Sequence, residues 1–451
     1  MELLNNSSED KLLESLQNIE NIVKKNLYFN HKIRKLELIQ IARKKQKKYP
    51  EKWKKLKKKF GKILKLLKTR EREIKYWNDY YENKENDYGY LLYYDNNIIT
   101  RLYNNIKVKK ISTIFNNNYN QSSFIILSND NKLYAKGLNS FQQLGIKDQN
   151  FITELKEIKN DNLKYCIDVK MGWSHTIFNC KKKIYGCGCG ISGRLGNNLT
   201  KNINPISELI ITEKINKIEC GSTNTYFLTE NGEIFSCGNK KYVGFESDED
   251  ILIPKKINID SKYKFIDISV GMGSYHIIAL NNNGEVYSWG HNRVGQTSFY
   301  PKNRLNLNFN PIIILPKKID IDFLVYKISG GWGHSGILDF EGSLYLFGRN
   351  CSGQLGLKKE ESNQIVNIIN NNFTYYSNRI KKLNFKNKIV DFYCGTLCTI
   401  FKIVNNNGNE LIYKIGSINK NNFNYHPQLI FNNFMYEGKI NIKGNNIFLI
   451  N

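Results

Sequence analysis

Residues 331–356 read Gly331-Trp-Gly-His-Ser-Gly-Ile-Leu-Asp-Phe-Glu-Gly-Ser-Leu-Tyr-Leu-Phe-Gly-Arg-Asn-Cys-Ser-Gly-Gln-Leu-Gly356. The pattern predicts two short strands, over 335–340 and 343–347, joined by a tight turn at Glu341-Gly342 and followed by a glycine-punctuated loop over 348–356. Glycine adopts positive φ angles at no steric cost, so glycines at fixed offsets indicate turn geometry rather than chemistry. We therefore interpret the segment as a β-hairpin with its closing loop.

The same pattern recurs along the chain. Well-defined copies lie at 273–296 and 172–196, and weaker copies at 221–244, 133–145 and 395–416. The glycine that closes the second strand recurs at intervals of 51, 50, 52, 58 and 68 residues, at Gly137, Gly188, Gly238, Gly290, Gly348 and Gly416. A period of about 50 residues is typical of an array of four-stranded units, so the sequence predicts an all-β propeller rather than a sandwich.

These residues resemble the regulator of chromosome condensation repeat family, whose unit is a Gly-x-x-His turn, a hairpin, Trp-Gly-x-Asn and Gly-Gln-Leu-Gly. The resemblance covers residues 88–451 and implies seven blades, of which six repeats are clear in the sequence. We expect both ends of the chain to close the seventh blade. Residues 440–450 would supply its opening half, and 90–94 with 98–99 its outer strands, which removes free edges that invite aggregation.

The repeat residues themselves are expected to have structural roles. His175, His276 and His334 share one offset, but propeller symmetry should hold them far apart, so a shared metal site is not expected. Ser123, Asn224 and Cys398 occupy that offset in other copies, which indicates a side chain that bonds to local backbone. The residues assigned to repeat structure are Gly172, His175, Gly188, Gly221, Gly238, Gly273, His276, Gly290, Gly331, His334, Gly348 and Gly356.

The nine cysteines are interpreted as buried small residues. Most lie beside glycines within predicted strands, and Cys187-Gly-Cys189 and Cys394-x-x-x-Cys398 are the only close pairs. A zinc site normally needs four ligands from paired knuckles. We expect neither a metal nor a cofactor.

Targeting signals are not evident. The N-terminus lacks the basic and apolar regions of a signal peptide, and no run approaches the about 20 apolar residues that span a membrane. We expect an intracellular protein of the nucleus or cytoplasm, with an organelle as the alternative.

Residues 1–85 contain no repeat and predict a basic α-helical arm, which leaves 86–451 as the propeller domain. Pro50 suits the first turn of a helix in which apolar side chains recur at helical spacing. This stripe contains Trp53, Leu56, Phe60, Ile63, Leu64 and Leu67.

Positive charge is concentrated in this arm. Residues 31–76 contain 20 Lys+Arg and 4 acids, a net +16 out of +26 for the whole chain. Such density gives a salt-sensitive affinity for polyanions, because each neutralised phosphate releases counterions. The candidate polyanion-binding residues are Arg43, Lys44, Lys45, Lys47, Lys48, Lys54, Lys55, Lys57, Lys58 and Lys59.

Four interpretations of the arm stay open. It could bind DNA or structured RNA, or pack its Trp53 stripe on the propeller with its lysines in water. It could also lie on an anionic membrane or be bound by a calmodulin-like partner. The fourth interpretation is a targeting segment, such as a nuclear localisation patch at 44–48.

Catalytic motifs are absent from the sequence. It contains no phosphate-binding Gly-x-x-x-x-Gly-Lys-[Ser/Thr] loop, no His-Glu-x-x-His and no Gly-x-Ser-x-Gly, and we assign no catalytic residue. We therefore expect a monomeric, non-enzymatic scaffold that binds proteins through a propeller face and nucleic acid or ribonucleoprotein through 31–76. The resemblance implies an alternative, guanine-nucleotide exchange on a Ran-type small GTPase at chromatin, which requires differential binding rather than bond chemistry.

Overall fold

The computed structural model divides into two units, residues 1–87 and 88–451. Every residue that the structure describes lies in the second unit. The described residues are 91–95, 98–103, 106, 108–116, 121–147, 149–259, 263–271, 273–299, 312–367, 372–405, 410–417, 423–432, 439–443 and 446–450. The predicted helical arm over 1–85 and its basic residues fall outside them.

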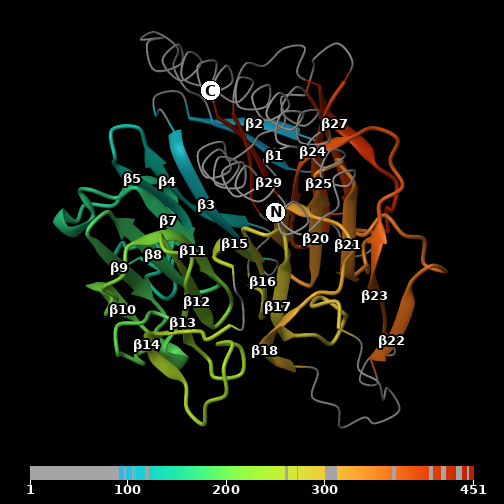
Figure 1. The fold of residues 1–451 in the computed structure, drawn as a ribbon. Coiled ribbons are helices and arrows are strands. Elements are labelled where there is room, and N and C mark those ends of the chain that lie inside the picture. Colours follow the sequence, from blue (N-terminus) through green and yellow to red (C-terminus); the bar gives the residue numbers. More distant parts are fainter. Residues whose placement is uncertain are drawn as a thin grey trace, which may run out of the picture. The chain divides into compact units, whose positions relative to one another are not determined.

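Six antiparallel sheets form six blades, which lie around a common centre (Figure 1). The first strand of each blade along the chain lies at its inner edge, and the inner strands of successive blades are neighbours. The first three blades are blade 1 with β3 (Val108–Asn116), β4 (Gln121–Ser128), β5 (Leu133–Leu138) and β6 (Phe151–Glu157), blade 2 with β7 (Asp168–Met171), β8 (His175–Cys180), β9 (Lys183–Gly188) and β10 (Asn204–Glu208), and blade 3 with β11 (Ile215–Cys220), β12 (Asn224–Thr229), β13 (Ile234–Gly238) and β14 (Ile251–Lys256).

The next three blades repeat this order, except that blade 5 has a fifth strand at its outer edge. They are blade 4 with β15 (Phe265–Val270), β16 (His276–Asn281), β17 (Val286–His291) and β18 (Ile312–Lys318), blade 5 with β19 (Val325–Gly330), β20 (His334–Asp339), β21 (Leu344–Arg349), β22 (Asn363–Asn367) and β23 (Asn372–Lys382), and blade 6 with β24 (Ile389–Cys394), β25 (Cys398–Val404), β26 (Glu410–Gly416) and β27 (Gln428–Asn432). The described residues contain two short 3-10 helices, η1 (Asp161–Leu163) and η2 (Ile191–Gly193). The prediction of an all-β propeller with six clear repeats is confirmed. The hairpin strands of blade 5 begin within one residue of their predicted starts.

A further four-stranded sheet joins the two ends of the second unit. It contains β1 (Leu91–Asp95), β2 (Ile98–Tyr103), β28 (Lys439–Lys443) and β29 (Asn446–Ile450), in the order β2-β1-β29-β28. Strand β1 pairs with β29 antiparallel, and β28 neighbours β3 of blade 1.

The glycine that ends the third strand has the same backbone conformation in all six blades. Its φ angle lies between +87° and +116°. In blade 5 an added Cβ at Gly348 would lie 2.6 Å from the carbonyl oxygen of Gly333 on the adjacent strand end. Both the dihedral angle and the close approach exclude a side chain, which explains why the sequence repeats glycine here.

The core lies between neighbouring blades rather than within any one of them. In β16, Ile277 and Ala279 belong to the cluster shared with blade 3, whereas Ile278 and Leu280 belong to the cluster shared with blade 5. Alternate side chains of one strand therefore fill two different cores. Because both faces are buried, the second strand of a blade reads as a continuous apolar run instead of an alternating one.

Candidate protein-binding face

Two sets of loops emerge at one end of the blades. These are the loops between the first and second strands and the loops after the third strand, which share an end because consecutive strands are antiparallel. Trp173 of blade 2 packs here on Gly273 of blade 4, where an added Cβ would lie 2.8 Å from Cε3 of the indole. The same Cβ would lie 3.7 Å from Cδ1 of Trp332 in blade 5. Side chains from three blades thus meet at one surface.

We call this surface the Trp–Arg face. It contains three aromatic residues from the first set of loops and three arginines from the second. They are Trp173, Tyr275, Trp332, Arg194, Arg293 and Arg349.

Two of the three aromatic residues of the Trp–Arg face are exposed to solvent. Trp173 is 43% exposed and Tyr275 is 40% exposed. The ring of Tyr275 lies 5.2 Å from that of Tyr242 in blade 3. Trp332, in the corresponding loop of blade 5, is half-buried. Trp289 is instead fully buried, because it lies in a third strand and not in a loop.

The arginines of the face are held by neutral groups. The Arg349 guanidinium lies over the Trp332 ring, with Cζ 4.5 Å from the ring centre, and its Nε donates to Cys351 Sγ over 2.9 Å. The Arg194 Nη1 donates to Ser174 Oγ over 2.9 Å and to the Ser222 carbonyl over 3.0 Å. Burial lowers the pKa of the Arg194 guanidinium below its ordinary value. Within the described residues, none of the three arginines forms an ion pair with a carboxylate.

The repeat histidines bind neighbouring blades beneath this face. His175 Nε2 lies 2.9 Å from Thr225 Oγ1, and His334 Nε2 lies 3.0 Å from Thr399 Oγ1. Each pair joins one blade to the next. His276 Nε2 makes the same contact, 2.8 Å from Ser335 Oγ.

The acceptor hydroxyl in each pair fixes the direction of the hydrogen bond. Thr399 Oγ1 donates to the Gln354 carbonyl over 2.9 Å, and Thr225 Oγ1 donates to the Arg194 carbonyl over 2.6 Å. The hydroxyl proton is therefore occupied, so the histidine Nε2–H donates to the oxygen. This arrangement requires a proton on Nε2 of each ring.

Burial keeps these three histidines neutral. It lowers the pKa of His175, His276 and His334 to about 3 in each case. Nearby cations act in the same direction, namely Arg194 at His175 and Arg349 at His334. The rings cannot act as acid or base catalysts near neutral pH.

The structure changes one expectation about this position. Ser123 and Asn224 do bond to local backbone, since Ser123 Oγ accepts from Leu138 N and Asn224 Nδ2 donates to the Asn239 carbonyl. The histidines instead reach the following blade, because an imidazole is long enough to span the interface.

The loop that precedes His276 is longer than its counterparts. Val270 pairs with Ile277, whereas Met171 pairs with Thr176, so two additional residues lie between β15 and β16. Gly271, not Gly273, therefore occupies the position of Gly172. Gly273 has a φ of +66° and supports the Trp173 ring instead.

A ring of alternating charges lines the inner strands. The ring is formed by one residue on the first strand of each blade. This residue pairs with the second-strand residue that lies four places after the repeat histidine or its equivalent. It is lysine in odd-numbered blades and aspartate in even-numbered ones. In blade order the residues of the ring are Lys110, Asp168, Lys217, Asp267, Lys327 and Asp391.

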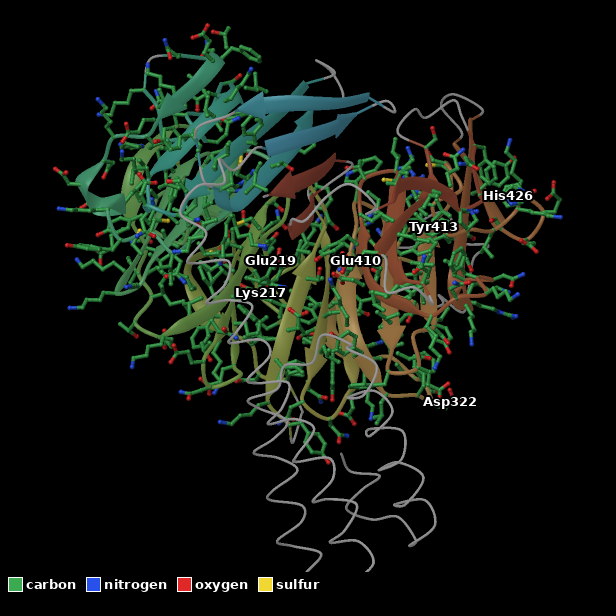
Figure 2. All side chains as sticks on the ribbon, turned by 90° about the horizontal axis from the view of Figure 1, so that it is seen from above. Lys217, Glu219, Asp322, Glu410, Tyr413 and His426 are labelled. Atoms are coloured by element: carbon green, nitrogen blue, oxygen red, sulfur yellow. The ribbon has the colours of Figure 1, made fainter. Side chains whose placement is uncertain are left out.

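Each lysine of this ring binds the aspartate of the next blade. The Nζ–Oδ1 distance is 3.2 Å for Lys110 and Asp168 and 2.7 Å for Lys217 and Asp267, and Lys327 pairs with Asp391. Burial alone would lower the pKa of Lys217, but Asp267 and Glu219 outweigh it and raise that pKa above the ordinary value. Figure 2 shows Lys217 and Glu219 close together among the inner strands.

Metal and thiol chemistry receive no support from the described part of the chain. Over those residues, no group of three or more His, Cys, Asp or Glu side chains is arranged to hold a metal ion. All nine cysteines are free thiols, eight of them buried, and Cys351 is half-buried beside Arg349. Cys187 is buried, and this desolvation raises its pKa to about 12. No described helix has the length and apolar character needed to cross a membrane.

Sequence reasoning missed the Trp–Arg face as a unit. Its arginines lie more than 50 residues apart along the chain, and only the arrangement of the blades around a common centre places them at the same end of the blades. A usable signal was the tryptophan inside two Gly-x-x-His turns, at Trp173 and Trp332, because an aromatic residue in a tight loop has no strand face to bury it.

The architecture defines a β-propeller built of repeated four-stranded blades, each joined to the next through its second strand. Two segments identify the repeat. Residues 268–296 and 341–401 each match the regulator of chromosome condensation (RCC1) repeat. The chain therefore contains RCC1-type repeats, as the sequence pattern predicted.

Curated relatives share this repeat. The chain is 27% identical over 251 residues to the mouse E3 ubiquitin-protein ligase HERC2, covering 53% of this chain and 5% of that protein. It is 29% identical over 192 residues to the ultraviolet-B receptor UVR8 of Arabidopsis thaliana, covering 41% of each. The chain thus spans less than half the length of these relatives.

Solved structures show the same fold. The chain superposes on human WBSCR16 with a TM-score of 0.63 at 14% identity, covering 81% of this chain and 98% of that one. It superposes on yeast RCC1 (Prp20), solved bound to Kap60, with a TM-score of 0.62 at 16% identity, covering 82% and 91%. A second structure of Prp20p, from Saccharomyces cerevisiae, describes its binding to Gsp1p and histones.

Proposed function

We propose that the protein is a non-enzymatic interaction scaffold, in which the propeller binds protein partners and the basic residues 31–76 bind nucleic acid or a ribonucleoprotein. One observation supports the second part above all. Residues 31–76 hold 20 cations against 4 acids, so most of these cations have no carboxylate available within the segment. Several lysines of the described propeller, by contrast, form ion pairs with carboxylates of the same or the next blade, as Lys217 does with Asp267. The unbalanced charge is suited to a polyanion.

The experiment is a salt titration of binding to duplex DNA and to structured RNA, using the full chain. Each lysine that neutralises a phosphate contributes about 0.9 to the slope of log K against log salt. A quintuple lysine-to-glutamine variant should therefore flatten the slope by up to about 4. The variant changes Lys54, Lys55, Lys57, Lys58 and Lys59.

The control removes the same charge from the surface of the propeller. Its slope should equal that of the wild-type protein. A control that flattens the slope as much as the arm variant would contradict a binding site in 31–76. The control positions are Lys109, Lys132, Lys183, Lys256 and Lys318.

Closure of the propeller is part of the proposal. We infer that β1, β2, β28 and β29 act as a seventh blade, which makes 86–451 one closed domain and 1–85 a separate arm. The neighbouring position of β28 and β3 supports this. Replacing Phe448 with Asp in β29 should then lower the melting temperature of the whole propeller in one transition, and an unchanged melting temperature would contradict closure.

Guanine-nucleotide exchange on a Ran-type GTPase is the second candidate. It is supported by the fold similarity to Prp20, a protein described as binding Gsp1p and histones. The test is release of a fluorescent GDP analogue from such a GTPase, with and without the full chain. The scaffold proposal predicts no acceleration, and a saturable acceleration would establish exchange. We also propose that the protein acts as a monomer in the nucleus or cytoplasm.

A further inference from the structure

We propose that the Trp–Arg face binds an extended segment of a partner protein in which carboxylates flank an apolar side chain. The inference rests on the proposed function, because it specifies which surface of the scaffold takes a protein and what chemistry that protein presents.

The distribution of arginine is the first observation. The structure describes the side chains of four arginines, and three of them lie on this face. The fourth, Arg379, lies on β23 of blade 5. Every ion pair among the described residues uses lysine, so the arginines whose side chains are described gather almost entirely on one surface.

The second observation is that these guanidinium groups lack anionic partners within the described residues. Arg349 is half-buried and is held by the Trp332 ring and by Cys351. Arg194 binds Ser174 and a carbonyl group and is only 7% exposed, so Arg349 and the exposed Arg293 are the guanidinium groups open to a partner. Contacts to neutral groups fix the orientation of a guanidinium and leave its charge uncompensated. A guanidinium that is already oriented loses little side-chain freedom when it binds a carboxylate through two hydrogen bonds.

The third observation is the exposed aromatic surface beside them. Trp173 and Tyr275 are each about two-fifths exposed, and Ile191 from the loop after β9 is 45% exposed. Gly273 supports the Trp173 ring from below. A rigid aromatic surface of this kind gains most by covering an apolar side chain.

A peptide fits this combination better than a nucleic acid does. Tryptophan, tyrosine and arginine are the residues that dominate binding energy in protein interfaces. A site for a phosphate backbone needs a continuous row of cations, whereas the Trp–Arg face offers separate guanidinium groups around an aromatic centre. Asp250 also lies near Arg194, where its charge acts to raise the pKa of that guanidinium, so the surface is not uniformly positive.

The test uses a fluorescent peptide of sequence Glu-Asp-Glu-Leu-Phe-Asp-Glu-Asp, with the full chain, in a binding titration. Two control peptides replace either the Leu-Phe pair with Ser-Ser or every acid with Gln. Both controls should bind at least about 10-fold more weakly, because the site needs both features.

Variants then locate the site. Arg349→Gln and Trp173→Ala should each weaken peptide binding about 10-fold or more, whereas Arg379→Gln, an equal loss of charge outside the face, should leave it within about 2-fold. Arg349→Lys should behave like Arg349→Gln if bidentate geometry matters, since lysine retains only the charge. Circular dichroism melting curves check that every variant is folded.

Three outcomes would overturn the inference. Peptide affinity could be unchanged in both face variants, the Ser-Ser peptide could bind as well as the parent, or single-stranded RNA could replace the peptide at the face. RNA binding measured in parallel with the quintuple lysine variant separates the two proposals. If the quintuple variant loses RNA binding but still binds the peptide, both proposals are supported. If it still binds both RNA and the peptide, only the proposed role of residues 31–76 is contradicted.

Discussion

His334 of blade 5 and Thr399 of blade 6 share a buried hydrogen bond, with Nε2 3.0 Å from Oγ1, although 65 residues separate them in the sequence. The Thr399 hydroxyl in turn donates a hydrogen bond to the Gln354 carbonyl of blade 5. The imidazole, the hydroxyl and the carbonyl thus form a chain of two hydrogen bonds that connects the two blades. The same arrangement joins blade 2 to blade 3 and blade 4 to blade 5.

Removing this link should destabilise the propeller. Thr399→Val leaves the Nε2–H of His334 and the Gln354 carbonyl buried without their partner, which should lower the free energy of unfolding by about 1–3 kcal/mol. Chemical denaturation with a fluorescence readout measures the change. His426→Ala is the control, since His426 is exposed at the outer edge of blade 6, away from the inner strands (Figure 2). It should change the free energy by less than about 0.5 kcal/mol, and equal losses in the two variants would contradict the role of the link.

The neutral histidines should make the fold sensitive to acid. Their pKa of about 3 lies below the ordinary value of 6.5, so the unfolded chain takes up protons first as the pH falls. Stability should therefore be highest above pH 6.5 and decrease between 6.5 and about 3, by up to about 1.4 kcal/mol per pH unit for each histidine. Carboxylates in ion pairs affect the pH dependence of stability mainly below about pH 5.

Titrating stability in the full chain and in His334→Asn isolates this contribution. Asparagine occupies the equivalent position naturally at Asn224, where its amide bonds to local backbone. The variant should lose about a third of the slope between pH 6.5 and 5, because one of three buried histidines is gone. Identical slopes would show that the histidines do not set the acid response.

The glycine at the end of the third strand should not tolerate a side chain. Gly348→Ala should lower the free energy of unfolding by more than about 2 kcal/mol, because φ is +105° and the Cβ would meet the Gly333 carbonyl at 2.6 Å. Gly333→Ala is the matched control on the opposing strand end. Its Cβ would meet the flexible Arg349 side chain at 3.3 Å and a methyl group of Val294 at an ordinary 3.9 Å, and no backbone atom within 4 Å is among its three nearest neighbours. Melting curves that rank the two variants in the opposite order would contradict this account.

The features that sequence could predict are those that depend on local backbone geometry. Gly348 and its five equivalents recur because a positive φ and a close strand approach admit no other residue. The spacing of these glycines along the sequence therefore predicts the length of one blade. Strand β16 contains an uninterrupted apolar run, residues 277–280, because both of its faces are buried, and this run hid the alternation typical of β-structure.

Features that depend on how the blades are arranged around one another could not be predicted. The partner of His334 lies in the next blade, and nothing near His334 in sequence indicates that Thr399 will receive its hydrogen bond. Trp173 is exposed and Trp289 is fully buried although both are tryptophans, and only the position of Trp173 in a loop accounts for the difference. Arg194 and Arg349 meet at one face because blades 2 and 5 belong to the same ring.

The alternation of lysine and aspartate on the inner strands should contribute more stability than surface ion pairs do. Lys217 Nζ lies 2.7 Å from Asp267 and 3.2 Å from Glu219, and also donates to the Ile268 carbonyl over 2.8 Å. Lys217→Met leaves two partly buried carboxylates without this cation, so the free energy of unfolding should fall by about 1–3 kcal/mol. Adding Asp267→Asn should restore part of the loss, since one of the uncompensated charges is then removed.

Lys183 supplies the matched comparison, because its Nζ lies equally close to a carboxylate, 2.7 Å from Glu208, but on outer strands where both side chains are about half exposed. Lys183→Met should cost less than about 0.5 kcal/mol, since water already solvates both charges. Raising the salt concentration should reduce the Lys183 effect and leave most of the Lys217 effect, because a partly buried pair is screened less. If Lys217→Met costs no more than Lys183→Met at either salt concentration, the alternating charges act as ordinary surface pairs, and the blades are held together by their apolar contacts and histidine bonds alone.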